Sequence, residues 1–224
     1  MRKYIVALAG LLSAAPFLSA AEPTSSRFYL MPSAEYMFMG NLELKDSAAY
    51  PSRKVQFKDA AGLSLEAGFC LTEQHIFKFE TGYFKTENEA SSAPTVNGFY
   101  APTTAKLEIV PLLLGYKYQQ KINERWQFHV GVLQGMTMLR TRTTDHFLGD
   151  SVPISGGVIV FPPADYSYNS TDYVFTFGGE VGLDYKLSDR SEFSFGVKCR
   201  ALGQTDTTKQ AVTTSVKLGY KFRF

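Results

Sequence analysis

The sequence predicts an all-β protein, an eight-stranded antiparallel up-and-down transmembrane β-barrel. Three observations lead to this fold class. Eight segments alternate apolar side chains with small, polar or charged ones at a period of two residues. Short connections alternate with long ones, as expected when the tight turns all lie at one end of a barrel. An apolar leader precedes the segments, which is typical of an exported chain.

The leader begins with two cations, Arg2 and Lys3, and continues with the apolar run "YIVALAGLLSAA". This run is too short to span a bilayer as a helix, and the small residues Ser19 and Ala21 stand at the −3 and −1 positions before Glu22. We therefore predict a signal peptide over residues 1–21 and a mature outer-membrane barrel domain over residues 22–224. Cleavage one residue earlier and an uncleaved membrane anchor are the alternatives.

The charge balance excludes one large class of partners. Removing the leader removes two of the 23 Lys and Arg and none of the 21 Asp and Glu, so the mature chain is formally neutral. No basic patch is present in the sequence, and we expect no nucleic-acid partner.

The eight segments follow one another along the whole mature chain. They cover residues 28–38, 61–71, 77–85, 107–118, 126–138, 173–187, 192–200 and 212–224. In the first, Phe28, Tyr36 and Phe38 share a face and Glu35 lies on the other. The fourth is irregular because its apolar phase switches at Pro111, where we expect a β-bulge to restore the face.

The connections alternate in length. The short ones contain "TEQH", "QQKINER" and "SDRS", whereas the long ones follow the first, third and fifth segments. In the last of these, residues 141–172, apolar residues flank Gly156 and Gly157, which predicts a hairpin with a two-residue turn. We expect this hairpin to pack on neighbouring loops; an exposed apolar tip that binds a partner is the alternative.

The strands of a soluble β-sandwich also alternate apolar and polar side chains. Further observations must therefore decide whether the apolar face contacts lipid or a protein core. Aromatic residues gather at segment ends, such as Tyr116, Tyr118 and Trp126, as in interfacial girdles. The segments are longer than ordinary sandwich strands. The polar face carries both charge signs and many glycines, which suits the interior of a narrow barrel.

The predicted interior is a polar core of mutually paired charges, since charges removed from bulk water need partners. Its members are Glu35, Glu66, Lys78, Glu80, His129, Glu180, Asp184, Lys186, Glu192, Lys198, Arg200 and Lys217, with Arg27, Lys221 and Arg223 as further cations. Cys70 shares the inward face and Cys199 the outward face, so we expect no disulfide between them.

The signal peptide, the eight alternating segments and the final "VTTSVKLGYKFRF" resemble the small OmpA/OmpX-type outer-membrane β-barrels of bacteria. "IVPLLLGYKYQ" is similar to a strand common in that group. The resemblance implies localisation in the bacterial outer membrane, with outer-membrane lipid and lipopolysaccharide as partners. It also implies that Leu218, Tyr220, Phe222 and Phe224 form the signal read by the barrel-assembly machinery.

Some barrels of this shape modify lipid A, so the chain has to be inspected for catalytic groups. The deacylases need a Ser two residues after a His, but Gly131 follows His129 at that spacing. His146 with Asp145 and Asp150 bears only a faint likeness to the palmitoyl-transferring barrel. We predict no catalytic residue, no cofactor and no metal site, since no nucleophile–base pair is evident.

The leading hypothesis is a non-enzymatic surface protein: the barrel anchors it, and the long loops contact a possible external ligand. The alternatives are a narrow, porin-like channel for small solutes, similar to the OmpW type, and a lipid A-modifying enzyme. A lumen crowded with paired charges favours the first hypothesis over a channel.

Overall fold

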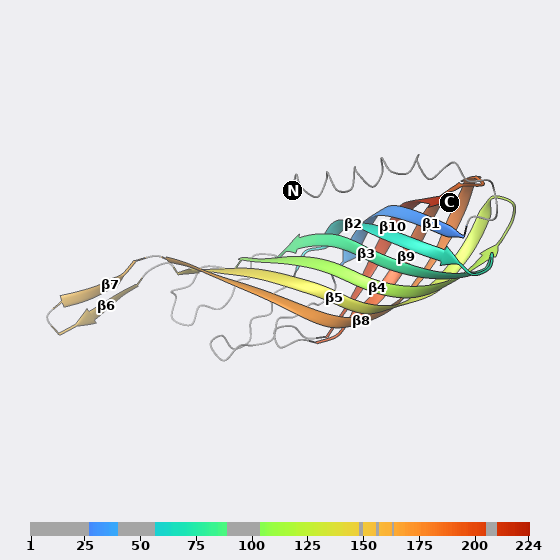
Figure 1. The fold of residues 1–224 in the computed structure, drawn as a ribbon. Helices are drawn as coiled ribbons and strands as arrows, with labels where there is room; N and C mark the ends of the chain where they lie inside the picture. Colours follow the sequence, from blue (N-terminus) through green and yellow to red (C-terminus); the bar gives the residue numbers. More distant parts are fainter. Residues whose placement is uncertain are drawn as a thin grey trace.

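The computed structural model describes residues 27–39, 57–88, 104–147, 150–155, 157–162, 164–204 and 210–224. Eight strands form a closed antiparallel barrel in the order β1-β10-β9-β8-β5-β4-β3-β2, which confirms the predicted fold class (Figure 1). The strands are β1 Phe28–Phe38, β2 Ala60–Cys70, β3 His75–Glu87, β4 Thr104–Lys121, β5 Trp126–Phe147, β8 Ala164–Ser188, β9 Ser191–Leu202 and β10 Ala211–Arg223. The predicted signal peptide lies outside the described residues.

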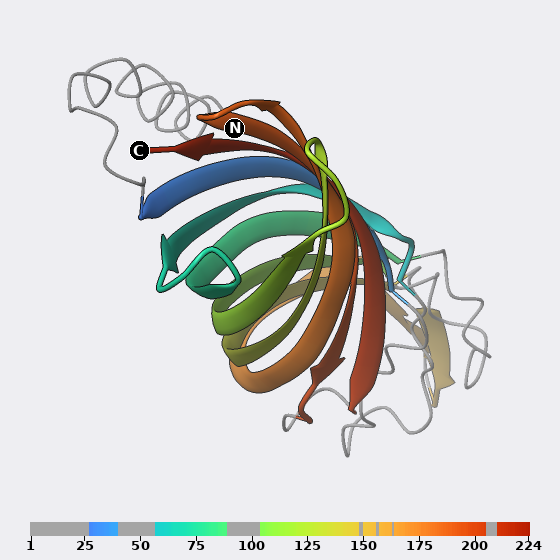
Figure 2. The ribbon, with the colours of Figure 1, turned by 90° about the vertical axis from the view of Figure 1, so that its right-hand side faces the viewer.

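The barrel closes between its first and last strands, as Figure 2 shows in a view along the barrel. Phe224 donates its backbone N–H to the Phe28 carbonyl at 2.9 Å. The turns after β2, β4 and β8 lie at this same end, which we call the short-turn end; the opposite end is the long-loop end. Among the described residues, no helix is long and apolar enough to cross a membrane.

Side chains alternate strictly between the two faces of the barrel wall. Along β1, Tyr36 and Phe38 are exposed on the outside while Glu35 is buried inside. The cysteines follow the same rule: Cys70 is buried and Cys199 is exposed, both as free thiols, which confirms that they lie on opposite faces of the wall. The outside is therefore apolar over most of its height, which is the reverse of a water-soluble protein.

The predicted bulge in the fourth strand is wrong. β4 keeps one register with β5 along its whole length, and its pairing with β3 also resumes without a shift beyond Pro111. Leu107 and Ile109 point into the barrel, whereas Leu112 points out. The apolar phase switches because the interior itself becomes apolar at this height, so a buried Leu no longer marks the outer face.

The predicted hairpin between β5 and β8 is present, with β6 spanning Asp150–Ile154 and β7 spanning Gly157–Phe161. Ile154 pairs with Gly157, so Gly157 begins β7 and is not a turn residue as the sequence predicted. β5 and β8 remain paired up to Phe147 and Ala164 and carry the hairpin away from the barrel (Figure 1).

The expectation that the hairpin packs on other loops is also wrong. Val158 and Val160 are 60 % and 69 % exposed, and Ile159 is exposed as well. The apolar tip is thus left open to solvent in this structure, which agrees with the alternative of an exposed tip.

Candidate functional site

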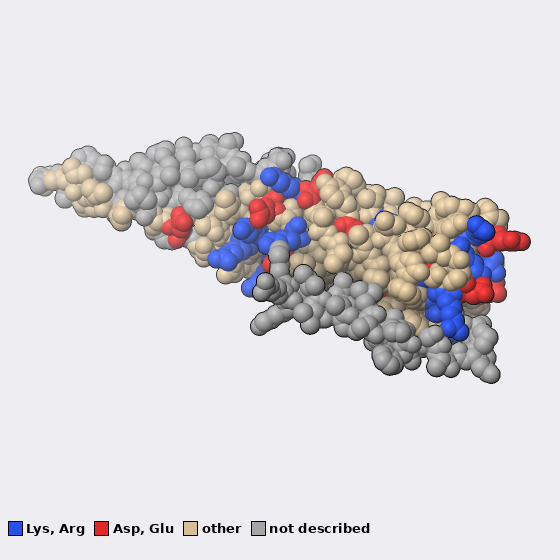
Figure 3. All heavy atoms as spheres, turned by 90° about the horizontal axis from the view of Figure 1, so that it is seen from above, with Lys and Arg blue, Asp and Glu red and all other residues tan. Residues whose placement is uncertain are grey.

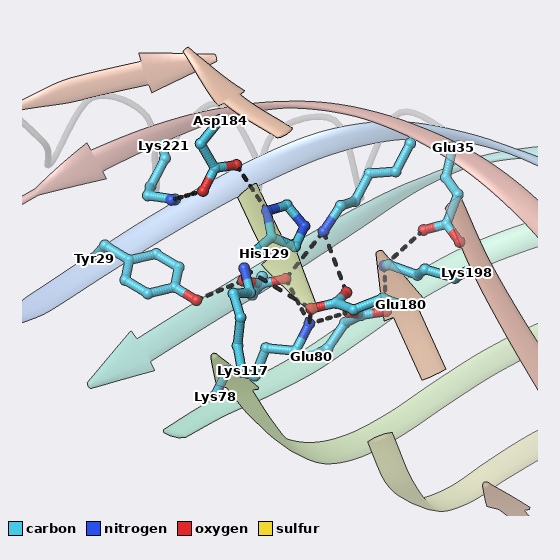
Figure 4. A network of polar contacts seen from close by, with 12 residues as sticks. Tyr29, Glu35, Lys78, Glu80, Lys117, His129, Glu180, Asp184, Lys198 and Lys221 are labelled. Carbon is cyan, nitrogen blue, oxygen red and sulfur yellow. Dashed lines mark hydrogen bonds and ion pairs between the residues drawn. The ribbon is translucent and has the colours of Figure 1, made fainter. Parts of the chain in front are cut away.

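The interior of the barrel holds most of the ionisable side chains that the sequence analysis singled out, and Figure 4 shows part of their network. The central network consists of four carboxylates and five cations whose side chains are at most 2 % exposed. Its members are Glu35, Glu66, Glu80, Glu180, Lys78, Lys117, Lys198, Arg200 and Lys217. They come from seven strands, so the network ties together nearly the whole circumference of the barrel.

Glu66 is the most highly connected carboxylate of the central network. Lys78 and Lys217 lie 2.9 and 3.1 Å from its Oε2 atom, and Lys117 lies 2.6 Å from Oε1. The Tyr29 hydroxyl donates a further hydrogen bond to Oε1 at 2.5 Å. Both oxygens are thereby satisfied without water, as a buried carboxylate requires.

Lys78 connects Glu66 with two more carboxylates. Its Nζ atom lies 2.5 Å from Glu180 Oε1 and 3.4 Å from Glu80 Oε2. Lys217 also approaches Glu180, at 3.7 Å from Oε2. Since each lysine serves several carboxylates, the charges form one network rather than separate pairs.

Glu80 and Glu35 share their cations on the side of the network nearer the long-loop end. Lys198 lies 2.6 Å from Glu80 and 3.2 Å from Glu35, and Arg200 Nη2 lies 3.0 and 2.6 Å from the same carboxylates. Ser215 donates a hydrogen bond to Glu35. The Glu35–Arg200 contact joins residues 165 positions apart in the chain.

A second cluster fills the short-turn end of the interior. Lys221 lies 2.6 Å from Asp184 and 2.7 Å from Glu192, and Arg223 Nε lies 2.8 Å from Glu192. The Tyr29 ring stands between the two clusters, with Lys117 and Lys221 at 5.5 and 5.3 Å from its centroid. Tyr29 is thus a cation–π spacer that keeps two ammonium groups apart.

Between the central network and the long-loop end, the interior is apolar. The apolar layer comprises Met37, Met39, Phe57, Ala60, Phe84, Ala105, Leu107, Ile109, Leu139, Val174, Leu202 and Ala211, all buried at the long-loop half. Arg200 lies at the boundary, with its guanidinium carbon 5.8 Å from the centroid of the Phe84 ring. The lumen is therefore filled by two kinds of packing, ionic and apolar, one on top of the other.

Most of the predicted interior residues are buried together, but two predicted members are not. Lys186 lies at the rim, where its side chain is 37 % exposed and pairs with Asp189 of the neighbouring turn at 2.6 Å. Arg27 is exposed just before β1. Both positions are in phase with the inward-facing residues of their strands. They lie too close to the end of the barrel, however, for their side chains to reach the central network.

Sequence reasoning missed Lys117, which contacts Glu66 directly. The residue shares the inward phase of Leu113 and Gln119 on β4. A strict alternation over the second half of that strand was the signal that could have found it. The assumed bulge drew attention to the outward phase instead.

The candidate assembly residues lie on the outer face of the last strand. Leu218 is 50 % exposed, and Tyr220, Phe222 and Phe224 are half-buried at the short-turn end. Tyr220 contacts the rings of Phe193 and Phe222 at centroid distances of 5.2 and 4.6 Å. Their role in barrel assembly stays a prediction.

Glu66, Glu80 and Glu180 each offer an oxygen within 4.8 Å of the others, which is the spacing of a potential metal site. Each of these carboxylates already accepts contacts from two or more of the buried cations. The donor set is therefore occupied by ammonium and guanidinium groups, and it does not fit a divalent cation.

His129 is the one buried histidine among the described residues. Its Nδ1 atom lies 3.3 Å from Asp184, but Nε2 has no hydrogen-bond partner in the part of the chain that the structure describes. The nearby Ser194 hydroxyl is likewise without one. Within the described ranges of the chain, no nucleophile lies within hydrogen-bond reach of His129, and its side chain is fully enclosed.

No family model and no curated protein matches this sequence. Solved structures do resemble it. The outer-membrane protein OprG from Pseudomonas aeruginosa is similar with a TM-score of 0.54 and 11% identity, over 89% of this chain and 96% of that one. Neisserial surface protein A is similar with a TM-score of 0.50 and 16% identity, over 88% and 97%. The protein thus has the fold of small outer-membrane β-barrels.

Proposed function

We propose that the protein is a non-enzymatic surface protein of the bacterial outer membrane, whose barrel is a closed anchor for its long loops. The outer wall supports a location in lipid, because its exposed residues are large and apolar. They include Leu112, Leu114, Val130, Val132, Phe175, Phe177, Val181, Leu183, Phe195 and Leu218. A band of this size would be an aggregation hazard in water.

The distribution of charge on the surface agrees with this orientation. In Figure 3, blue and red atoms gather towards the two ends of the described barrel, with a mostly uncharged surface between them. Rings meet at the short-turn end, with Trp126 and Tyr185 at a centroid distance of 4.8 Å and Phe28 and Phe69 at 4.9 Å. Aromatic residues at such a boundary are typical of membrane barrels.

The filled interior is the observation that carries the choice of an anchor over a channel. Between the short-turn end and the apolar layer, the charges of the central network contact one another instead of lining a water path. Above them, Phe84 and Leu107 are completely buried. An ion entering the lumen would have to break buried pairs and then cross an apolar layer, and both steps are costly.

Planar-bilayer conductance tests the proposal. We expect the refolded protein to insert, as judged by its heat-modifiable band on gels, and to give no steady unitary current. The double variant Leu107→Gly, Phe84→Ala removes two large side chains from the apolar layer. Comparing its conductance with that of the unaltered protein reveals whether this layer blocks the passage of ions. A reproducible open-channel current from the unaltered protein would contradict the anchor and favour the narrow channel.

Contact of the loops with an external ligand and recognition by the assembly machinery remain predictions. The exposed tip formed by Val158, Ile159 and Val160 is the described part of the long-loop end that offers apolar contact area.

A further inference from the structure

An outward-facing group of charged side chains lies on β3, β4 and β5 at the long-loop end. We call it the cationic patch; it consists of Lys85, Lys106, Arg140 and Arg142, with Glu87 and Glu108 among them. All are exposed except Glu108, which is half-buried. With four cations against two carboxylates, the patch carries a net positive charge.

The strand register sets these side chains next to one another. Glu108 on β4 pairs with Lys85 on β3 and with Arg140 on β5. The next row joins Glu87, Lys106 and Arg142 in the same way. Cross-strand partners on one face lie about 5 Å apart at Cβ, so the patch spans two rows and three strands.

Only one of the four cations in the patch is held in an ion pair among the described residues. Lys106 lies 3.6 Å from Glu87, which uses one cation and one carboxylate. Lys85, Arg140 and Arg142 make no ion pair in the described part of the chain. Both arginines have guanidinium groups with five donors, and these are suited to bidentate contact with phosphate.

The cationic patch is one-sided. At the same end of the barrel, the outward residues of β1, β9 and β10 in the described strands are uncharged. They are Tyr36, Phe38, Ala201, Val212 and Thr214. Within the described strands, the cations at this end are thus concentrated on one sector of the wall, which favours a specific site over a general solubilising rim.

The patch also borders directly on the apolar wall. One row towards the barrel centre, Val110 pairs with Met138, and Met138 with Tyr173. One row further, Leu112, Met136 and Phe175 are neighbours and exposed. Cations at such a border lie at the headgroup level of the leaflet into which the wall is inserted.

We propose that the cationic patch binds the phosphate of a membrane-lipid headgroup in the outer leaflet, with Arg140 and Arg142 as its principal contacts. This inference rests on the proposed location of the barrel in the membrane. The patch lies on the wall beside the acyl-chain region and not at the tip of the protein. A lipid phosphate reaches it without leaving the bilayer, whereas a soluble polyanion has no apolar part to match the adjoining rows.

The experiment uses the mature chain in phosphatidylcholine nanodiscs containing a minor fraction of diphosphoryl lipid A, with retained lipid counted by native mass spectrometry. We expect the double variant Arg140→Gln, Arg142→Gln to retain the phosphorylated lipid roughly tenfold less well. The matched control, Lys121→Gln with Arg125→Gln, removes the same charge at the short-turn end and leaves retention unchanged. A dephosphorylated lipid A gives the baseline for both.

Three outcomes would overturn the inference: equal retention by the Arg140, Arg142 variant and the unaltered protein, an equal loss in the control, or displacement of the lipid by millimolar inorganic phosphate. The last would assign the patch to free phosphate. If the unaltered protein failed to enter nanodiscs at all, the proposed membrane location itself would fail, which is a separate result.

Discussion

The two halves of the barrel interior solve the same packing problem in different ways. In the half nearer the short-turn end, nine ionisable side chains are packed as the central network, and most of them contact two or more partners of opposite charge. In the other half, the apolar layer packs around Phe84 and Leu107, and none of its members is charged. Both halves are equally closed to solvent.

The two halves are expected to differ in how much stability a single substitution removes. An apolar contact is non-directional, so a neighbouring side chain can adjust when one member is altered. A buried ion network has no such freedom, because removing one charge leaves its partners uncompensated. We therefore expect the central network to fail as a unit and the apolar layer to fail gradually.

The largest effect is expected for Glu66→Ala, because three lysines, Lys78, Lys117 and Lys217, lose their common carboxylate. The free energy of unfolding should fall by about 3–5 kcal/mol. Urea unfolding in lipid vesicles measures it through the fluorescence of Trp126, the single tryptophan of the chain. A loss below about 1 kcal/mol would mean that the network is not the coupled unit described above.

An intermediate effect is expected for Leu107→Ala in the apolar layer. The truncation loses the transfer free energy of the side chain and leaves a cavity, at a cost of about 2–4 kcal/mol in the same unfolding assay. Leu107→Met keeps the volume and should cost less than about 1.5 kcal/mol. If Leu107→Met were as harmful as Leu107→Ala, the layer would be as intolerant as the network, and the contrast between the halves would disappear.

The smallest effect is expected at the rim, for Lys186→Gln. Its hydrogen bond and charge lower the pKa of the Asp189 carboxyl, which is fully exposed. A lowered pKa contributes stability above the ordinary pKa of Asp, and this contribution fades as the pH falls through the lowered value. The pair is screened by water, so unfolding in urea should not change measurably.

In the same variant, NMR titration of Asp189 should show its pKa rising towards the ordinary value of an Asp side chain, because the ammonium partner is gone. A measurable loss of stability at neutral pH would place Lys186 in the central network after all.

Much of the fold could be predicted because a barrel wall imposes a period of two on every strand. The inward phase of Glu35, Glu66 and Lys198 followed from alternation alone. The error at Pro111 arose from the assumption that apolar side chains always face out. The pairing of β4 with β3 is interrupted beside Pro111, where an N–H is lacking, yet the register does not shift.

By itself, the sequence determined the eight strands of the barrel, the two faces of each and most of the charges that share the interior. Only the tertiary structure decided which charges meet, since Glu35 and Arg200 are distant along the chain and are brought together by barrel closure. It also decided the level of each side chain along the barrel, which separates the apolar layer from the central network and leaves Lys186 at the rim. Alternation specifies the direction of a side chain, whereas strand tilt and stagger specify its height.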